Sequence, residues 1–114
     1  MTQTNSITQA IVTALNYRGH LAHRNNTTGV YDAKLKLFRK TVNHTALGVG
    51  DVLCVLKGGY WLEIEIKSGR DKQNANQVLR QERVERAGGL YWLVRSFDEF
   101  EKLYHRHILS QLKL

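Results

Sequence analysis

The sequence contains no proline and a single cysteine, Cys54. One cysteine cannot form an intrachain disulfide, so we expect an intracellular, reducing compartment, such as the cytoplasm, and a role for Cys54 as a small core residue. The chain also has no apolar run long enough to span a membrane and no charged-then-apolar leader. We therefore expect neither a membrane protein nor a secreted one.

Two common site chemistries are missing as well. No glycine-rich loop ending in Gly-Lys-Ser or Gly-Lys-Thr is present, which argues against a nucleoside triphosphatase. His105 and His107 are two residues apart on a predicted helix and do not share a face. No other histidine or cysteine stands at metal-ligand spacing, so the sequence predicts no zinc site.

Positive charge is what the chain has in excess. Its 114 residues include 17 basic and 10 acidic side chains, for a net charge of +7, and 42% are hydrophobic. This length and apolar content suit one domain over residues 1–114 with its own core. The charge favours a polyanionic partner, first of all nucleic acid, over the alternative of a merely basic protein.

The most informative stretch, residues 48–67, reads GVGDVLCVLKGGYWLEIEIK. It predicts two strands, Val52–Lys57 and Tyr60–Lys67, joined by a tight turn at Gly58–Gly59. Because side chains alternate along a strand, one face of the second strand is apolar and the other is charged. The core face should carry Leu62, Ile64 and Ile66, and the opposite face Glu63, Glu65 and Lys67.

Asp51 stands at the start of the first of these strands, beside Glu65 and Lys67 on its hairpin partner. Carboxylates are the ligands that Mg²⁺ prefers, and a neighbouring lysine can hold a phosphate oxygen or a water. The pattern therefore predicts a Mg²⁺ or Mn²⁺ site in a basic chain. The alternative is a surface ladder of salt bridges. Glu63 is predicted to be solvated or to serve a second metal.

Helices and strands alternate around this hairpin, in the predicted order α-β-β-β-β-α-β-α. A mixed central sheet flanked by helices is the natural architecture, with Tyr60–Lys67 and Leu90–Arg95 as parallel neighbours. The other predicted elements are a helix from the cap Ser6 to Gly19, strands His20–Arg24 and Ala33–Lys40, a helix Gln73–Ala87, and a last helix capped by Ser96.

An ordered set of motifs resembles the virus-type replication-repair nuclease domain (VRR-NUC) of the PD-(D/E)xK nuclease superfamily. The resemblance spans residues 6–100. The matching motifs are Arg24-Asn25, Gly48-x-Gly50-Asp51, Glu65-Ile66-Lys67, Gln77 and Ala87-Gly88-Gly89.

The resemblance implies a restriction-endonuclease-like α/β core and a metal-dependent DNA endonuclease, structure-selective on branched DNA such as four-way junctions. It implies catalytic roles for Asp51, Glu65, Lys67 and Gln77, with the backbone carbonyl of Ile66 as a third metal ligand. It also implies DNA contact or support of the site by Arg24 and Asn25, a homodimer, and a bacterial or phage-infected cell. The alternative function is a non-catalytic basic module that binds nucleic acid.

Further basic residues are candidates for DNA contact. Lys34, Lys36 and Lys40 alternate along a predicted strand, where the alternative is a solvated face. Arg80, Arg83 and Arg86 lie at three-residue spacing on one broad side of the second predicted helix, where salt bridges to Glu82 and Glu85 are the alternative, and Arg80 and Arg83 are the candidates for DNA contact.

The sequence departs from the family pattern in two places. Gly50 stands where the family usually has proline. The family commonly carries a glutamate on its first helix, whereas this chain has no acid before Asp32, and Gln9 is the candidate replacement.

The wide apolar side of residues 97–112 is predicted to exceed what one small sheet can cover and to offer a dimer surface.

Overall fold

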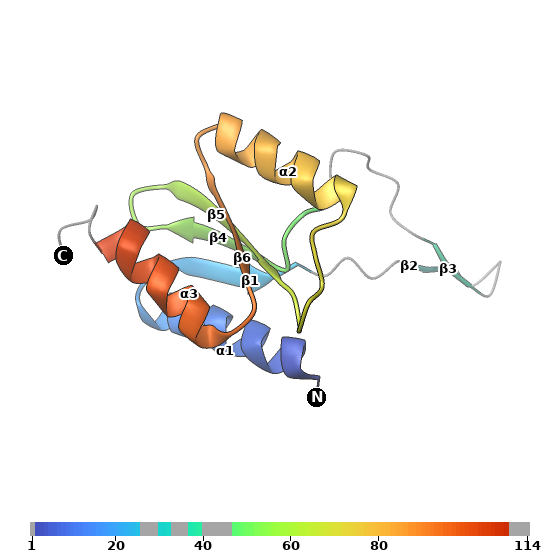
Figure 1. Ribbon diagram of the computed structural model, residues 1–114, viewed down its shortest axis with the longest axis horizontal. Coiled ribbons are helices and arrows are strands. Elements are labelled where there is room, and N and C mark those ends of the chain that lie inside the picture. Colours follow the sequence, from blue (N-terminus) through green and yellow to red (C-terminus); the bar gives the residue numbers. More distant parts are fainter. Residues whose placement is uncertain (1, 26–29, 33–36, 40–46, 110–114) are drawn as a thin grey trace.

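The computed structural model describes residues 2–25, 30–32, 37–39 and 47–109. Its central sheet has four strands in the order β1-β4-β5-β6, and three helices flank it (Figure 1). In chain order the elements are α1 (Gln3–Tyr17), β1 (Leu21–Arg24), β2 (Val30–Asp32), β3 (Leu37–Arg39), β4 (Val52–Leu56), β5 (Tyr60–Ile66), α2 (Ala75–Arg86), β6 (Leu90–Val94) and α3 (Phe97–Tyr104), which continues as a π-helical turn, His105–Leu109.

The sheet is mixed, as predicted. β1 pairs antiparallel with β4, β4 antiparallel with β5, and β5 parallel with β6. The β4–β5 hairpin forms as predicted, with Gly58 and Gly59 at positive φ angles, 94° and 90°, which only glycine adopts readily. Its turn is one residue longer than the predicted two-glycine turn, because β4 ends at Leu56, which pairs with Tyr60 and leaves Lys57 in the loop. The predicted parallel pairing of the two strands around α2 is confirmed.

The predicted start of the first helix is wrong. The helix begins at Gln3 instead of after Ser6, because the Thr2 hydroxyl caps it by accepting from the Asn5 amide at 3.1 Å. Within the strand predicted over Ala33–Lys40, the described residues form β3, which does not join the four-stranded central sheet. β2 and β3 pair with each other in a separate sheet. Lys34, Lys36 and Lys40 lie outside the described residues.

One face of the sheet packs against α1 and α3 (Figure 1). The predicted apolar face of β5 is fully buried there, together with alternate residues of the other strands and the buried stripes of both helices. Cys54 is 1% exposed in this core, and burial raises the pKa of its thiol to about 12, so it is the inert core residue that was predicted. The core consists of Ile11, Leu15, Ala22, Val52, Cys54, Leu56, Leu62, Ile64, Ile66, Trp92, Val94, Phe100, Tyr104 and Ile108.

The apolar side of the last helix packs into this core. Phe100, Tyr104 and Ile108 are buried, and Phe97 and Leu103 pack partly buried against the same cluster. The prediction of a spare apolar side for a dimer is therefore wrong over the described part of α3 and its π-helical turn.

A buried histidine fastens this helix to the sheet. His20 Nε2 lies 2.7 Å from the Tyr104 hydroxyl, and His20 Nδ1 accepts from the Lys57 amide at 3.0 Å. Because Nδ1 is the acceptor, the proton of the neutral ring sits on Nε2. Burial, with the positive charges of Lys57 and Arg18, lowers the pKa of His20 and keeps the ring neutral.

The opposite face of the sheet is covered in part by α2 (Figure 1). This helix has a thin apolar content, and Gln77 and Val84 are its buried residues. The face beneath it carries Trp61, Glu63 and Glu65 of β5, which alternate with the core residues of the same strand. Polar side chains therefore meet between β5 and α2, and the candidate site lies there.

Candidate active site

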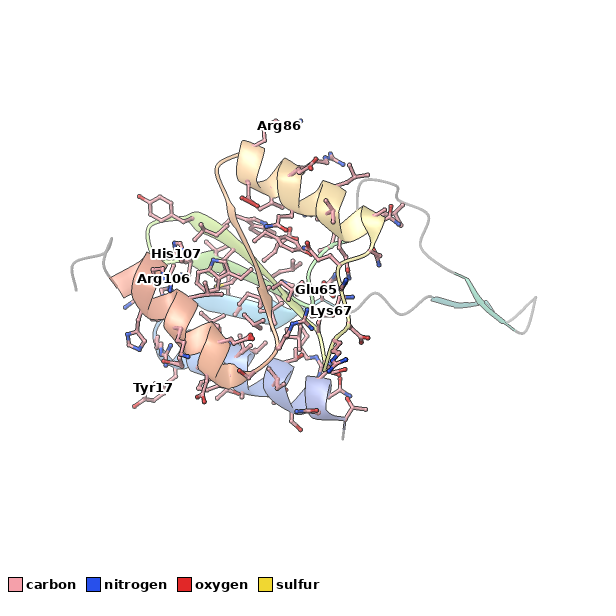
Figure 2. All side chains as sticks on the ribbon, in the orientation of Figure 1. Tyr17, Glu65, Lys67, Arg86, Arg106 and His107 are labelled. Carbon is pink, nitrogen blue, oxygen red and sulfur yellow. The ribbon has the colours of Figure 1, made fainter. Side chains whose placement is uncertain are left out.

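The hairpin and the start of α2 bring three of the predicted site residues together. Asp51 precedes β4, Glu65 lies near the end of β5, and Gln77 is in the first turn of α2. Asp51 Oδ2 accepts from the Ile66 amide at 2.8 Å, and Gln77 Nε2 donates to Glu65 Oε1 at 2.8 Å. Lys67 Nζ lies 3.8 Å from the same Glu65 oxygen. Figure 2 places Glu65 and Lys67 at the end of the sheet opposite His107.

Gln77 has two tasks at once. Its side-chain oxygen accepts from the Asn74 amide at 2.9 Å, and Asn74 Oδ1 accepts from the Gln77 amide at 2.9 Å, which makes a capping box for α2. Because the oxygen of the amide faces the helix cap, its nitrogen must face Glu65. This contact orients the Glu65 carboxylate, and the predicted contact of Gln77 with a water or phosphate stays a prediction.

The electrostatics of the pair favour a cation. Burial of Glu65 and, next, the negative charge of Asp51 raise the pKa of Glu65 to about 8, whereas the Lys67 ammonium opposes the shift. The carboxylates of Asp51 and Glu65 are neighbours and partly out of water, so they repel each other when both are charged. A divalent cation between them removes that repulsion, so the donor set fits a hard metal ion.

The described residues supply two carboxylates to this position and not a larger cluster. Among them, no three Asp, Glu, His or Cys side chains gather as a ready metal site. Mg²⁺ is commonly held by one or two carboxylates with waters in the other positions, and a backbone carbonyl such as that of Ile66 is the further protein oxygen that the resemblance implies. Asp51 already contacts the backbone of Ile66 through its amide.

Glu63 differs from its prediction. Its side chain is 0% exposed, so it is not solvated. It accepts from the Gly50 amide at 3.2 Å, from Trp61 Nε1 at 3.0 Å and from Arg80 Nε at 3.1 Å, and it forms an ion pair with Arg80. This carboxylate is a structural anchor whose lone pairs face protein donors.

The Arg80 guanidinium is thus held by the protein, and the hydrogen bond to Glu63 raises its pKa. Arg80 does form a salt bridge, as the alternative for this helix predicted, but its partner is Glu63 of β5 and not a glutamate of the helix. Arg83 is exposed one turn further along α2. DNA contact by either arginine stays a prediction.

Arg24 and Asn25 lie at the same end of the sheet as Asp51. The Asn25 amide donates to the Asp51 carbonyl at 2.8 Å, and Arg24 Nη2 donates to Asn5 Oδ1 of α1 at 2.9 Å. The pair supports the backbone that carries Asp51. Gln9, the candidate replacement for the family's helix glutamate, is exposed on α1 and donates to Thr13 at 3.4 Å, and its role in the site stays a prediction.

The glycine that replaces the family's proline has a physical reason here. Gly50 is buried, its amide donates to Glu63, and a Cβ added to it would lie 2.9 Å from the Ile64 carbonyl oxygen. Proline would remove the donor and add atoms where there is no room.

We therefore predict that Gly50→Pro lowers the free energy of unfolding by about 3 kcal/mol, from overpacking plus a charged acceptor left without its donor. Urea unfolding of the wild type, Gly50→Pro and Gly50→Ala measures this. Gly50→Ala keeps the amide and should lose about half as much by overpacking alone. Equal stability of wild type and Gly50→Pro would contradict this explanation.

The fold is that of the restriction-endonuclease-like α/β class, with a four-stranded mixed sheet and flanking helices. A solved structure described as a VRR_NUC domain superposes on this chain with a TM-score of 0.69 and 20% sequence identity, covering 94% of this chain and 99% of that one. The predicted resemblance is confirmed at the level of the fold. No family model and no curated protein matches the sequence. No helix in the described part of the chain is long and apolar enough to cross a membrane.

Proposed function

We propose that this chain is a divalent-cation-dependent DNA endonuclease that acts on branched DNA, such as flaps or four-way junctions. The observation that carries the proposal is the buried meeting of Asp51 and Glu65 beside Lys67, within a chain of net charge +7. The likeness to a VRR_NUC domain supports the same chemistry. A basic module that only binds nucleic acid has no need to gather acids inside its positive field.

The side chains divide the work among them. Asp51 and Glu65 would hold Mg²⁺ or Mn²⁺ with the Ile66 carbonyl, and Gln77 would keep the Glu65 carboxylate in its orientation. When bound, the ion supplies positive charge to the scissile phosphate and lowers the pKa of a water. Lys67 would contact a phosphate oxygen or orient the attacking water, because its ammonium lies next to Glu65 without a close contact.

A panel of labelled linear, flapped and four-way DNAs tests the proposal, each incubated with Mg²⁺ or Mn²⁺ and with a chelator. Faster cleavage of the branched members is expected. If every DNA stays intact with either metal, the enzyme proposal is wrong. Calorimetry of metal binding is a separate comparison with the non-catalytic alternative: the proposed enzyme should give metal-dependent heat, and the non-catalytic module should give none.

We further predict that DNA binding depends steeply on salt, through Lys34, Lys36, Lys40, Arg80 and Arg83. Each neutralised phosphate contributes a log–log slope of about −0.9 on duplex DNA. Arg83→Gln should therefore reduce the slope measured in chelator by about one phosphate. Lys102→Gln, an exposed base on α3 at the opposite face of the sheet, is the matched control and should leave the slope unchanged. A wild-type slope near zero would mean that the positive charge does not serve DNA binding.

A homodimer is the expected assembly, because symmetric cleavage of two strands requires two sites and one such domain presents one. Light scattering at micromolar concentration should give twice the mass of the chain. A measured mass equal to that of one chain would contradict the dimer and would take away most of the support for a four-way junction as the substrate.

A further inference from the structure

A second pocket lies on the same face of the sheet as the candidate active site. It has a volume of about 270 Å³ and is lined by Trp61, Arg80, Arg83, Val84, Ala87 and Gly89. Drug-sized ligands occupy about 300–1,000 Å³, so this pocket suits something as small as one planar ring system. Its walls are an aromatic ring, an apolar patch of α2 and two guanidinium groups.

The indole of Trp61 is held by the protein. Its Nε1 donates to the fully buried Glu63 at 3.0 Å, and Glu63 in turn pairs with Arg80. The backbone at Gly89 also approaches the indole closely, because a Cβ added to Gly89 would lie 3.1 Å from Trp61 Cδ1. Trp61 is nevertheless 36% exposed. A rigid aromatic side chain with an open surface, next to basic groups, is a preformed stacking platform.

The position of this platform relates it to the active site. Trp61, Glu63 and Glu65 share one face of β5, and four residues of strand separate the indole from Glu65. The strand rise places them about 13 Å apart along β5. Because Glu63 between them is fully buried and bonded to Arg80, a DNA strand cannot follow β5 beneath α2. A strand that passes over the exposed side of α2 covers a comparable distance and reaches Trp61 within a few nucleotides.

We infer that the Trp61 pocket binds an unpaired nucleotide of the DNA substrate, with the base stacked on the indole and a phosphate on Arg83; this deepens the proposed function by naming the substrate as DNA with unpaired nucleotides near the cut. Aromatic rings flanked by basic side chains bind single strands, because every base has a face that can stack. Duplex DNA cannot use the pocket, since its bases are already stacked on one another. Basic side chains alone would bind duplex and single-stranded DNA alike, whereas the indole can stack only on an unpaired base.

The test measures binding without cleavage, in chelator, by fluorescence anisotropy. The probes are a short labelled oligothymidylate and the same phosphodiester backbone carrying abasic sites, which matches it in length and charge. The wild type should bind the oligothymidylate on the order of tenfold more tightly than the abasic strand. Equal binding of the two probes by the wild type would overturn the inference.

Two variants locate the effect. Trp61→Phe and Trp61→Leu both lose the hydrogen bond to Glu63, but only the first keeps an aromatic face. Trp61→Phe should keep most of the preference for bases and Trp61→Leu should lose it. Arg83→Gln should weaken both probes by the same factor. Retention of the full preference by Trp61→Leu, with a circular dichroism melt like that of Trp61→Phe, would overturn the assignment to this pocket.

The inference and the proposed function fail separately. Cleavage of branched DNA by the same preparations is measured with Mg²⁺. Cleavage by the wild type without any preference for the oligothymidylate would overturn the stacking pocket and leave the nuclease proposal standing. A Trp61-dependent preference without any cleavage removes the nuclease and keeps the pocket as a site for unpaired nucleotides.

Discussion

Asp51→Asn is expected to lower the rate of DNA cleavage by at least about 100-fold, because it removes one of the two charges proposed to hold the cation. The change is small in shape. The asparagine oxygen can still accept from the Ile66 amide, and its nitrogen can donate to Glu65 in place of two repelling carboxylates. The free energy of unfolding should stay the same or rise.

DNA binding by Asp51→Asn should be unchanged or tighter, since the contacts depend on lysines and arginines and an acid that repels phosphate has gone. Gel shifts in chelator measure binding and single-turnover assays with Mg²⁺ measure cleavage. Asp71→Asn is the matched control, because it removes an exposed acid from the turn before α2 and should change neither. Lys67→Ala should lose cleavage and keep metal affinity. Cleavage by Asp51→Asn at the wild-type rate would mean that Asp51 is not a metal ligand.

Glu63→Ala is expected to lower the free energy of unfolding by about 3 kcal/mol. The change leaves the Gly50 amide, the Trp61 indole nitrogen and the Arg80 guanidinium without their acceptor. The figure is at the lower end for a broken buried pair, because the Arg80 side chain is 20% exposed and water can reach it.

Urea unfolding measures this effect. Glu82→Ala, an exposed acid on α2, is the matched control and should stay within about 0.5 kcal/mol of the wild type. If Glu63→Ala is as stable as Glu82→Ala, the Glu63 cluster, which comprises Glu63 and its partners Gly50, Trp61 and Arg80, does not hold α2 to β5.

The sequence predicts much of this fold because its local signals agree. Gly58 and Gly59 set the turn, and alternation in Tyr60–Ile66 sets which side of β5 enters the core. Those two facts place Asp51 next to Glu65. The distance from Lys67 to Gln77 is short enough that the crossover must return near the same strand end. The approach of Asp51, Glu65 and Gln77 was therefore predictable.

The Glu63 cluster was not predicted, because it depends on how α2 lies across β5. Gln77 contacts Glu65, and Arg80, one turn later, contacts Glu63. The helix thus runs back along the strand, and each turn of α2 meets an alternate residue of β5. Local patterns do not encode that packing angle. The signal that could have suggested it is the matching of polar residues at helical spacing with acids at strand spacing.

The separate β2–β3 hairpin and the commitment of α3 to the core were missed for a related reason. Short strands carry little periodicity, so the pairing of Val30–Asp32 with Leu37–Arg39 has no strong local signature. The apolar side of α3 seemed too wide for one small sheet, but α1 shares the same face and packs against α3. Burial depends on elements that are far apart in the sequence.

The most direct test of the nuclease proposal is a time course of cleavage on one branched DNA, first in chelator and then after Mg²⁺ is added in excess. The DNA should stay intact in chelator, and cutting should begin when the metal is added. Asp51→Asn, purified in parallel, should leave the DNA intact throughout, which excludes a contaminating nuclease. A metal-dependent active site at Asp51 and Glu65 would be contradicted if the DNA stays intact after Mg²⁺ is added, or if the wild type cuts it in chelator as fast as it does with Mg²⁺.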